Sequence, residues 1–123
     1  MSLPARYLRD KGLIKNKILD YGSGRGKDAM ELGADCYDPT FAPDPPTEKY
    51  DTILCTYVLN VVSKATEHKV VEKVRGLLAE GGRAYFTVRR DVPIEGTVSQ
   101  RYVRMSMPIL RETSTHCIYV LEA

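Results

Sequence analysis

The sequence has few of the residues that build covalent or metal-bound frameworks. Its 123 residues include three cysteines and two histidines. Cys36, Cys55 and Cys117 are odd in number and far apart in apolar segments, which is typical of reduced, buried thiols in a cytosolic protein. His68 and His116 are isolated from each other, so no metal site can be assembled from the sequence. A disulfide framework and a zinc site are therefore both disfavoured.

Long apolar runs and a strong net charge are also lacking. No apolar run approaches the ~18 residues of a membrane span, and the first residues have no apolar signal-peptide core. We therefore expect a cytoplasmic protein without membrane contact. The 18 basic and 16 acidic residues leave a net charge of +2, which gives no general argument for nucleic-acid binding. The length and the 43% hydrophobic content predict one globular domain over residues 1–123.

What the sequence does contain is an alternation of short apolar strands and helices. Strands are predicted at residues 17–21, 34–37, 50–56 and 83–89, and helices at residues 4–11, 27–32 and 63–79. This order predicts an α/β fold with a mostly parallel sheet covered by helices. The run at 50–56 is apolar without alternation, as in a strand that is buried on both faces.

Two segments depart from this alternation. Residues 39–47 hold four prolines, so they are expected to form an extended loop. Gln100–Met105 and Cys117–Leu121 are predicted to be two strands with no helix between them, which favours an antiparallel pair at one edge of the sheet.

A glycine-rich loop follows the first strand in the pattern Asp20-x-Gly22-x-Gly24-x-Gly26. A phosphate-binding P-loop requires G-x-x-x-x-G-K-[ST], but a tyrosine stands at the position of the first glycine and an aspartate at that of the hydroxyl. A dinucleotide fingerprint requires G-x-G-x-x-G, and Lys27 occupies its last position. Neither phosphate-binding pattern therefore matches.

The pattern that is present suits a ligand with hydroxyl and ammonium groups and no phosphate. Glycines at a tight strand-to-helix turn let a ligand lie directly on the backbone. Asp38, at the end of the next strand, could accept hydrogen bonds from both hydroxyls of a ribose. Asp20 could orient the loop or meet an ammonium group through water. An adenosine that carries an amino-acid tail meets these requirements better than a dinucleotide does.

These segments resemble the class I S-adenosylmethionine-dependent methyltransferases. The resemblance covers roughly residues 13–90 and rests on ILDYGSGRG, YDP, YDTILC, TYVLNVV and LLAEGGRAYFTV in the expected order. Together with PARYL and QRYV, the chain is also similar to small methyltransferase-like proteins of bacteria and phages. The resemblance implies a compact Rossmann-like fold and S-adenosylmethionine as the cofactor.

The same resemblance implies a role for particular residues. The methionine and ribose part of the cofactor would lie against the first strand end and the glycine loop, at Asp20, Gly22, Ser23, Gly24 and Gly26. Asp38 would hold the ribose hydroxyls. Cys55, Thr56 and Tyr57 would lie beside the sulfonium, where a tyrosine face attracts a cation by ~0.5–2 kcal/mol.

The family has a helix and a third strand between the ribose acid and the next strand. Here only twelve residues, 39 to 50, separate Asp38 from Asp51. We therefore predict that the third strand is missing and that the sheet order is 2-1-4-5 in the family's strand numbering, with the two tail strands at the far edge. The family's contact with adenine would be lost, and Phe41 either stacks on adenine or plugs the sheet edge.

The function implied is methyl transfer to an unidentified acceptor, either a small molecule or a nucleic acid that a partner presents. Arg89 and Arg101 are candidate substrate contacts, and solvated surface positions are the alternative for both. Asp51 is expected to bind nearby amides. Asn60 is expected to make a helix-start hydrogen bond, and a polar group at the cofactor edge is the alternative. No catalytic residue and no metal ligand can be named. A homo-oligomer is compatible with the sequence.

The competing hypothesis is an inactive module that binds S-adenosylmethionine or S-adenosylhomocysteine as a partner subunit or ligand sequesterer.

Overall fold

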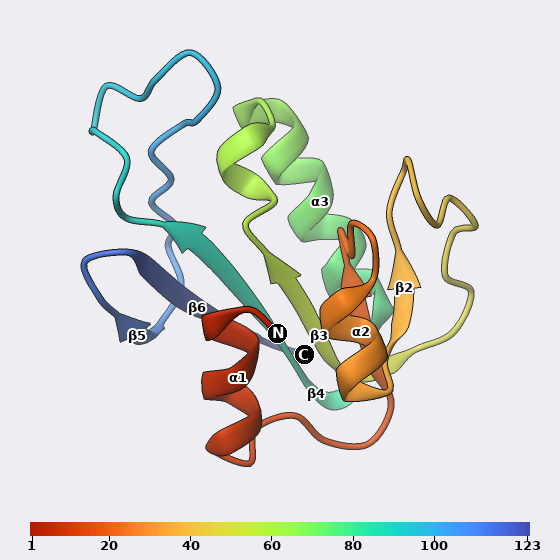
Figure 1. The fold of residues 1–123 in the computed structure, drawn as a ribbon. Helices are drawn as coiled ribbons and strands as arrows, with labels where there is room; N and C mark the ends of the chain where they lie inside the picture. Colours follow the sequence, from red (N-terminus) through yellow and green to blue (C-terminus); the bar gives the residue numbers. More distant parts are fainter.

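A six-stranded sheet forms the centre of the computed structural model, which describes residues 1–123 (Figure 1). The strands are β1 (Ile18–Tyr21), β2 (Asp35–Tyr37), β3 (Tyr50–Thr56), β4 (Leu78–Arg89), β5 (Ile109–Glu112) and β6 (His116–Glu122). Their order is β2-β1-β3-β4-β6-β5, with the first four strands parallel and β6 antiparallel to both of its neighbours. The predicted mostly parallel sheet with antiparallel tail strands is confirmed.

Three α-helices and one 3-10 turn cover this sheet. They are α1 (Leu3–Asp10), α2 (Lys27–Leu32), η1 (Leu59–Val61) and α3 (Lys64–Leu77). α3 begins where predicted, because the Ser63 hydroxyl accepts a hydrogen bond from the Thr66 amide at 3.1 Å and so caps the helix. α1 and α2 pack on one face of the sheet, and α3 packs on the other.

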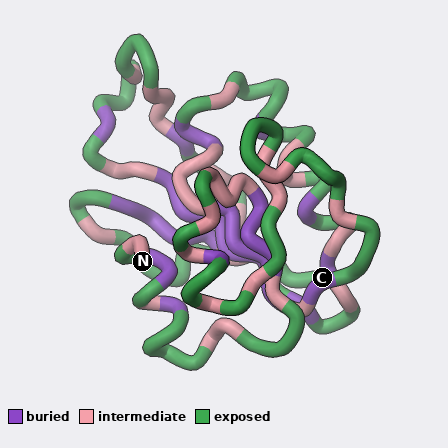
Figure 2. The backbone as a smooth tube through the Cα atoms, turned by 45° about the vertical axis from the view of Figure 1, so that its right-hand side comes forward, coloured by how far each residue is buried: buried purple, intermediate pink, exposed green.

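The two faces of the sheet bury unequal amounts of apolar surface. The cluster on the α3 face contains 15 buried residues, whereas the cluster under α1 contains five: Ala5, Leu8, Leu54, Tyr85 and Ile118. Figure 2 shows the buried residues concentrated along the central strands. β3 and β4 carry core residues on both faces, as expected for the non-alternating apolar run at 50–56.

The prediction of a strand at Gln100–Met105 was wrong. The second tail strand is β5, which pairs with β6 in antiparallel register. Residues 100–105 instead cross near the carboxyl end of β4, because the Arg101 backbone and side chain are bound there. The Arg101 amide donates to the Asn60 carbonyl at 2.7 Å, and its guanidinium reaches three further partners described below. These polar contacts hold the segment outside the sheet.

Two boundaries also differ from the prediction. α3 ends at Leu77, and β4 begins at Leu78 instead of at residue 83. The register of β4 on β3 shifts between the pairs Tyr50–Leu78 and Thr52–Arg83, so the Gly81-Gly82 turn bulges out of the strand. The two glycines therefore interrupt a strand and do not end a helix.

No strand lies between β2 and β3, as predicted. Between β2 and β3 the chain forms a loop whose one ladder contact is an isolated bridge between Asp38 and Ala42. β2 consequently forms an edge of the sheet. No helix in the chain has the length and apolar character needed to cross a membrane.

Candidate functional site

The glycine loop joins the carboxyl end of β1 to α2. The amides of Gly22 and Ser23 donate to the Tyr37 carbonyl at 2.7 and 2.9 Å, which ties the loop to the end of β2. Gly22 has φ +88°, and a Cβ at this position would lie 2.3 Å from Val58 Cγ2. No other residue fits there. At Gly24, with φ +56°, no atom lies within 4 Å of the corresponding Cβ position. The loop therefore presents bare backbone to open space.

A cleft of about 420 Å³ lies beside this loop at the carboxyl edge of the sheet. Six of its residues were predicted from the sequence: Asp20, Gly22, Ser23, Gly24, Thr56 and Tyr57. Small-molecule sites occupy roughly 300–1,000 Å³ and, in open α/β sheets, lie beyond the carboxyl ends of the strands. The size and the position of the cleft therefore both fit a small-molecule site.

Asp20 is the buried charge of the cleft. It is 4% exposed, and its carboxylate accepts no hydrogen bond from the protein. Burial, reinforced by the negative charges of Asp28 and Asp38, raises the pKa of Asp20 to about 7. A buried acid with no internal partner is well placed to attract a cationic group of a ligand.

Asp38 organises the loops around the cleft. One carboxylate oxygen accepts from the Gly24 amide at 2.8 Å, and the other accepts from the amides of Thr40 and Phe41 at 2.9 and 3.2 Å. Burial acts to raise the pKa of Asp38, but these three donors outweigh it and lower the pKa. A carboxylate offers about four lone-pair sites, so roughly one remains for a ligand.

Tyr57 forms the opposite wall of the cleft in an unusual conformation. Its φ of 61° is left-handed, and its amide donates to the Thr87 carbonyl at 2.8 Å. The guanidinium of Arg89 lies 5.7 Å from the centre of the Tyr57 ring and binds both oxygens of Asp91 at 2.8 and 2.6 Å. A left-handed tyrosine costs on the order of 1–2 kcal/mol, and such strain is typical of functional loops.

Four of the predicted cofactor residues do not line the cleft: Asp38, described above, and Cys55, Phe41 and Gly26. Cys55 is fully buried among the core residues of the α3 face, so its side chain does not line the cleft. Phe41 is 52% exposed, with the Arg25 guanidinium 5.0 Å from its ring centre. Gly26, with φ +85°, occupies the N-cap of α2.

Arg101, a predicted substrate contact, is half-buried and bound to other parts of the protein. Its guanidinium donates to the carbonyls of Val62 at 2.5 Å and Leu59 at 3.1 Å, and to the Glu67 carboxylate at 2.7 Å. These contacts leave little of the guanidinium for a ligand. Arg101 instead ties the segment after β4 to η1 and α3.

Asn60 lies in η1, but its side chain does not make the predicted helix-start hydrogen bond. It is 1% exposed, its amide oxygen accepts from the Arg89 amide at 2.7 Å, and its amide nitrogen donates to the Arg101 carbonyl at 2.7 Å. Asn60 thus links η1 to the end of β4 and to the segment of residues 100–105. Asp51 plays its expected part and accepts from the Lys17 amide at 3.0 Å.

Sequence reasoning missed four residues that line the cleft: Met1, Ser2, Lys27 and Asp28. The Ser2 amide and hydroxyl donate to the two oxygens of Asp28 at 2.7 and 2.6 Å, which fastens the start of α1 beside the glycine loop. No sequence signal connects residues so far apart. No group of three His, Cys, Asp or Glu side chains is arranged to hold a metal ion.

Comparison with protein-family models gives no match, and no curated protein matches the sequence. Several solved structures do match the fold. The 1,6-didemethyltoxoflavin-N1-methyltransferase of Burkholderia thailandensis, with bound S-adenosylhomocysteine, has a TM-score of 0.69 at 12% identity, over 98% of this chain and 76% of that one. A complex of DhpI with S-adenosylhomocysteine has a TM-score of 0.68 at 17% identity, over 95% and 81%.

A third match differs in length. The S-adenosylmethionine-dependent methyltransferase SibL has a TM-score of 0.67 at 10% identity, and the match covers 95% of this chain but 53% of SibL. This chain therefore spans about half the length of SibL. The shared part contains the sheet and the helices that form the cleft.

Proposed function

We propose that this chain, which has the fold of the S-adenosylmethionine-dependent methyltransferases, binds S-adenosylmethionine in the cleft and transfers its methyl group to an acceptor. The observation that carries the proposal is the unpartnered, buried carboxylate of Asp20 beside the open space over Gly24. When bound, this cofactor supplies an electrophilic methyl group. An acceptor nucleophile takes that group by in-line displacement.

The first contacts that we assign hold the methionine end. The carboxylate of Asp20 binds the ammonium group, directly or through water, because no hydrogen bond or ion pair within the protein occupies it. The backbone of Gly22, Ser23 and Gly24 lies against the ligand. A cation in the cleft favours the charged form of Asp20, so binding should lower the pKa of this carboxyl.

The sugar and the base extend toward the loop after β2. Asp38 has roughly one lone-pair site left after its three amide contacts. We therefore assign it one ribose hydroxyl, and not the two that the sequence suggested. Phe41, half-exposed on the same loop, remains our candidate for stacking on adenine.

The acceptor side is assigned to Thr56, Tyr57 and Arg89. Thr56 and Tyr57 leave β3 at the cleft, where the tyrosine face can lie near the sulfonium. Arg89, beside that ring, is our candidate contact for the acceptor, whereas Arg101 is assigned a structural role. Methyl transfer depends chiefly on alignment of three atoms, so positioning by these residues can supply much of the catalysis.

The second candidate function is a cofactor-binding module without transfer activity. It is favoured by the missing third strand, which leaves the loop of residues 38–49 in place of a strand and a helix. Such a chain would bind the cofactor and act as a partner subunit or a ligand sequesterer. Both functions require the same cleft, so they differ only in turnover.

Two measurements separate these functions. Calorimetry and thermal unfolding with S-adenosylhomocysteine should show binding and a raised melting temperature, because a ligand that binds only the folded state stabilises it. The absence of heat and of any thermal shift at millimolar ligand would exclude both functions. Methyl-labelled cofactor with a panel of small-molecule and nucleic-acid acceptors should then give label transfer. Binding without transfer would leave the inactive module.

A further inference from the structure

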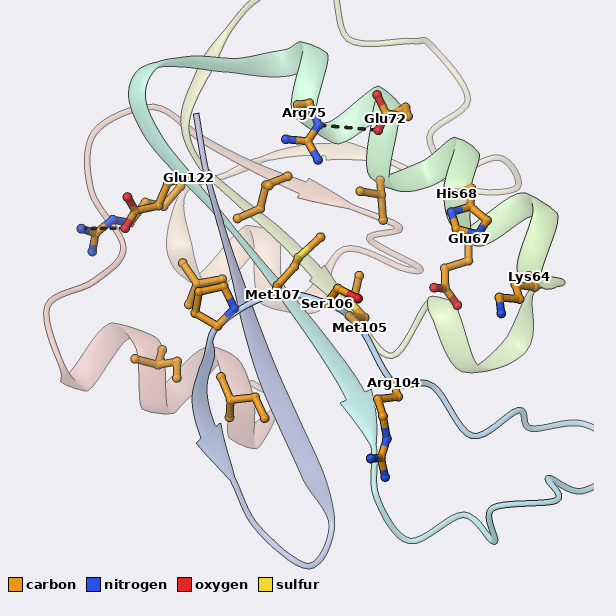
Figure 3. Close-up of a pocket in the computed structure, with 17 residues that line it drawn as sticks. Lys64, Glu67, His68, Glu72, Arg75, Arg104, Met105, Ser106, Met107 and Glu122 are labelled. Atoms are coloured by element: carbon orange, nitrogen blue, oxygen red, sulfur yellow. Dashed lines mark ion pairs between the residues drawn. The ribbon is translucent and has the colours of Figure 1, made fainter.

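The face of the sheet opposite α1 and α2 carries a long groove that the proposed function does not use. α3 is the one α-helix on this face, and the rest of the face is crossed by residues 104–108, which lead into β5 (Figures 1 and 3). A groove of about 840 Å³ runs between α3 and that segment, twice the volume of the cofactor cleft.

The groove is apolar along its middle. Val71 of α3, Met105 and Met107 of the crossing segment, and Leu121 of β6 line it. At its β5 side, Ile109 is 52% exposed and Leu110 is 36% exposed. Neighbouring exposed apolar side chains in a hollow are typical of an interaction site, whereas scattered ones are not.

The acidic side chains around the groove are all in ion pairs, whereas two of the basic side chains are not. All three of its carboxylates are in ion pairs: Glu67 with Arg101 at 2.7 Å, Glu72 with Arg75 at 3.6 Å and Glu122 with Arg83 at 3.3 Å. Lys64 and Arg104 line the same groove without a carboxylate partner. Figure 3 shows both at the end of the groove where α3 begins. This end therefore carries uncompensated positive charge.

The shape of the groove suits a helix. Lys64, His68, Val71 and Arg75 lie on one side of α3 at helical spacing and line the groove. At 1.5 Å per residue, the span from residue 64 to residue 75 is roughly 16 Å, or three helical turns. A second helix could lie alongside α3 at the usual interaxial distance of about 8–10 Å.

We propose that this groove docks an amphipathic helix of a partner protein. The apolar side of that helix packs on Val71, Met107 and Leu110, and an acidic residue near one end pairs with Lys64 and Arg104. A second copy of this chain that docks through the same groove is a poorer occupant, because every carboxylate of the groove is already paired and offers nothing to those two cations. Nucleic acid is also poorer, because two free cations are few for a phosphate backbone and the groove between them is apolar.

The probe for this proposal is a displayed library of 16-residue peptides selected against the folded 123-residue protein. Enriched peptides should share apolar residues at three- and four-residue spacing and an acidic residue at one end. Leu110→Glu and Arg104→Glu should each weaken a selected synthetic peptide roughly tenfold or more. Met30→Glu, at an 83% exposed position, and Lys69→Glu, at an exposed α3 position outside the groove, are the matched controls and should leave affinity unchanged.

Several results would overturn the proposal. No enrichment, or peptides whose affinity is the same for Leu110→Glu and the wild type, would show that the groove is not the docking site. Dimerisation of the wild-type chain that is lost in Leu110→Glu would make a second copy the occupant. Binding of a DNA duplex that is lost in Arg104→Glu but retained in Leu110→Glu would make nucleic acid the occupant. Thermal unfolding of each variant confirms that it is folded before binding is compared.

Discussion

At the scale of single residues, Asp20 shows how the fold changes the chemistry of a side chain. On the sequence it is one of sixteen acids, and its position before the glycine loop is its one distinction. In the fold it is 4% exposed, without a hydrogen-bond partner, and has a pKa of about 7. Near neutral pH the carboxyl therefore changes between its acid and its charged form, which an exposed aspartate would not do.

This shift predicts a pH dependence of stability. The folded state holds the Asp20 proton up to a pKa of about 7, whereas the unfolded chain loses it near 3.8. Between these values the folded state binds more protons, so stability falls as pH rises, by up to roughly 4 kcal/mol. Without ligand, the melting temperature of the wild type should fall from pH 5 to pH 8 more steeply than that of Asp20→Asn. Identical pH profiles would contradict the assignment.

The role of Asp38 can be tested by combining a protein variant with a ligand analogue. Asp38→Ala should weaken S-adenosylhomocysteine roughly tenfold, at the low end for one bond to a charged group, since one lone-pair site remains. The substitution also frees the amides of Gly24, Thr40 and Phe41, so part of the loss can come from the loops. Calorimetry with an analogue that lacks both ribose hydroxyls separates the two effects. An equal loss for both ligands would assign Asp38 to the loops alone.

Gly24 tests whether the ligand lies on the loop. Gly24→Val should abolish binding of S-adenosylhomocysteine, because the side chain would project into the open space above the loop. Gly12→Val is the matched control, since Gly12 has φ +69° and equally open surroundings but lies outside the cleft. Both variants carry the same backbone strain and should lose similar stability. Retained affinity in folded Gly24→Val would move the ligand elsewhere.

At the scale of elements, η1 couples two parts of the site. Asn60 and Arg101 hold η1 to β4 and α3, and Val58, just before η1, lies against Gly22 of the glycine loop. Tyr57 lies on the same short connection. The polar network therefore sets the position of the cleft wall without touching the cleft.

Asn60→Ala should show this coupling. It leaves the Arg89 amide and the Arg101 carbonyl unpaired, which costs about 1–3 kcal/mol for each buried group. We expect urea denaturation to show that loss and calorimetry to show weaker binding of S-adenosylhomocysteine. Asp51→Ala is a useful comparison, because Asp51 also accepts from a backbone amide but lies at the other end of β3. If the two variants bind equally well, η1 does not position the cleft.

The elements also show what the sequence could and could not predict. The strands at 18–21 and 50–56 and the helix capped by Ser63 followed from apolar runs and local capping, which short-range physics determines. Gln100–Met105 was predicted to be a strand, but long-range hydrogen bonds of Arg101 hold it near the carboxyl end of β4. The glycine loop was predicted because its pattern is local. The contribution of Ser2 to the cleft was not, because it depends on a contact with Asp28 across the fold.

At the scale of the whole molecule, the unequal cores predict unequal local stability. The cluster under α1 has five buried residues, against fifteen on the α3 face. α1 should therefore open at a lower free energy than the central strands, and its amides should exchange hydrogen faster than those of β3 and β4. Hydrogen exchange with mass spectrometry measures this. Protection of α1 equal to that of β3 would contradict it.

Ligand binding should reduce the difference in hydrogen-exchange protection between α1 and the central strands. Ser2 at the start of α1 lines the cleft, so S-adenosylhomocysteine should raise protection in α1 more than in β6, which lies outside the cleft. A uniform rise over all elements would indicate stabilisation of the whole chain without a local contact to α1. That the 123 residues act as one cooperative unit remains our proposal, and a single unfolding transition by two optical probes would support it.

The position of Tyr57 also gives the unmodified protein an optical signal. The chain contains eight tyrosines and no tryptophan, so its near-ultraviolet emission comes from phenol rings alone. Tyr57 lines the cleft beneath the Arg89 guanidinium, and a ligand that enters the cleft changes the surroundings of this ring. In a protein with tryptophan, energy transfer would obscure this change. Here the intensity of tyrosine fluorescence can follow occupancy of the cleft without a label, and Tyr57→Phe identifies the part of the signal that belongs to the site.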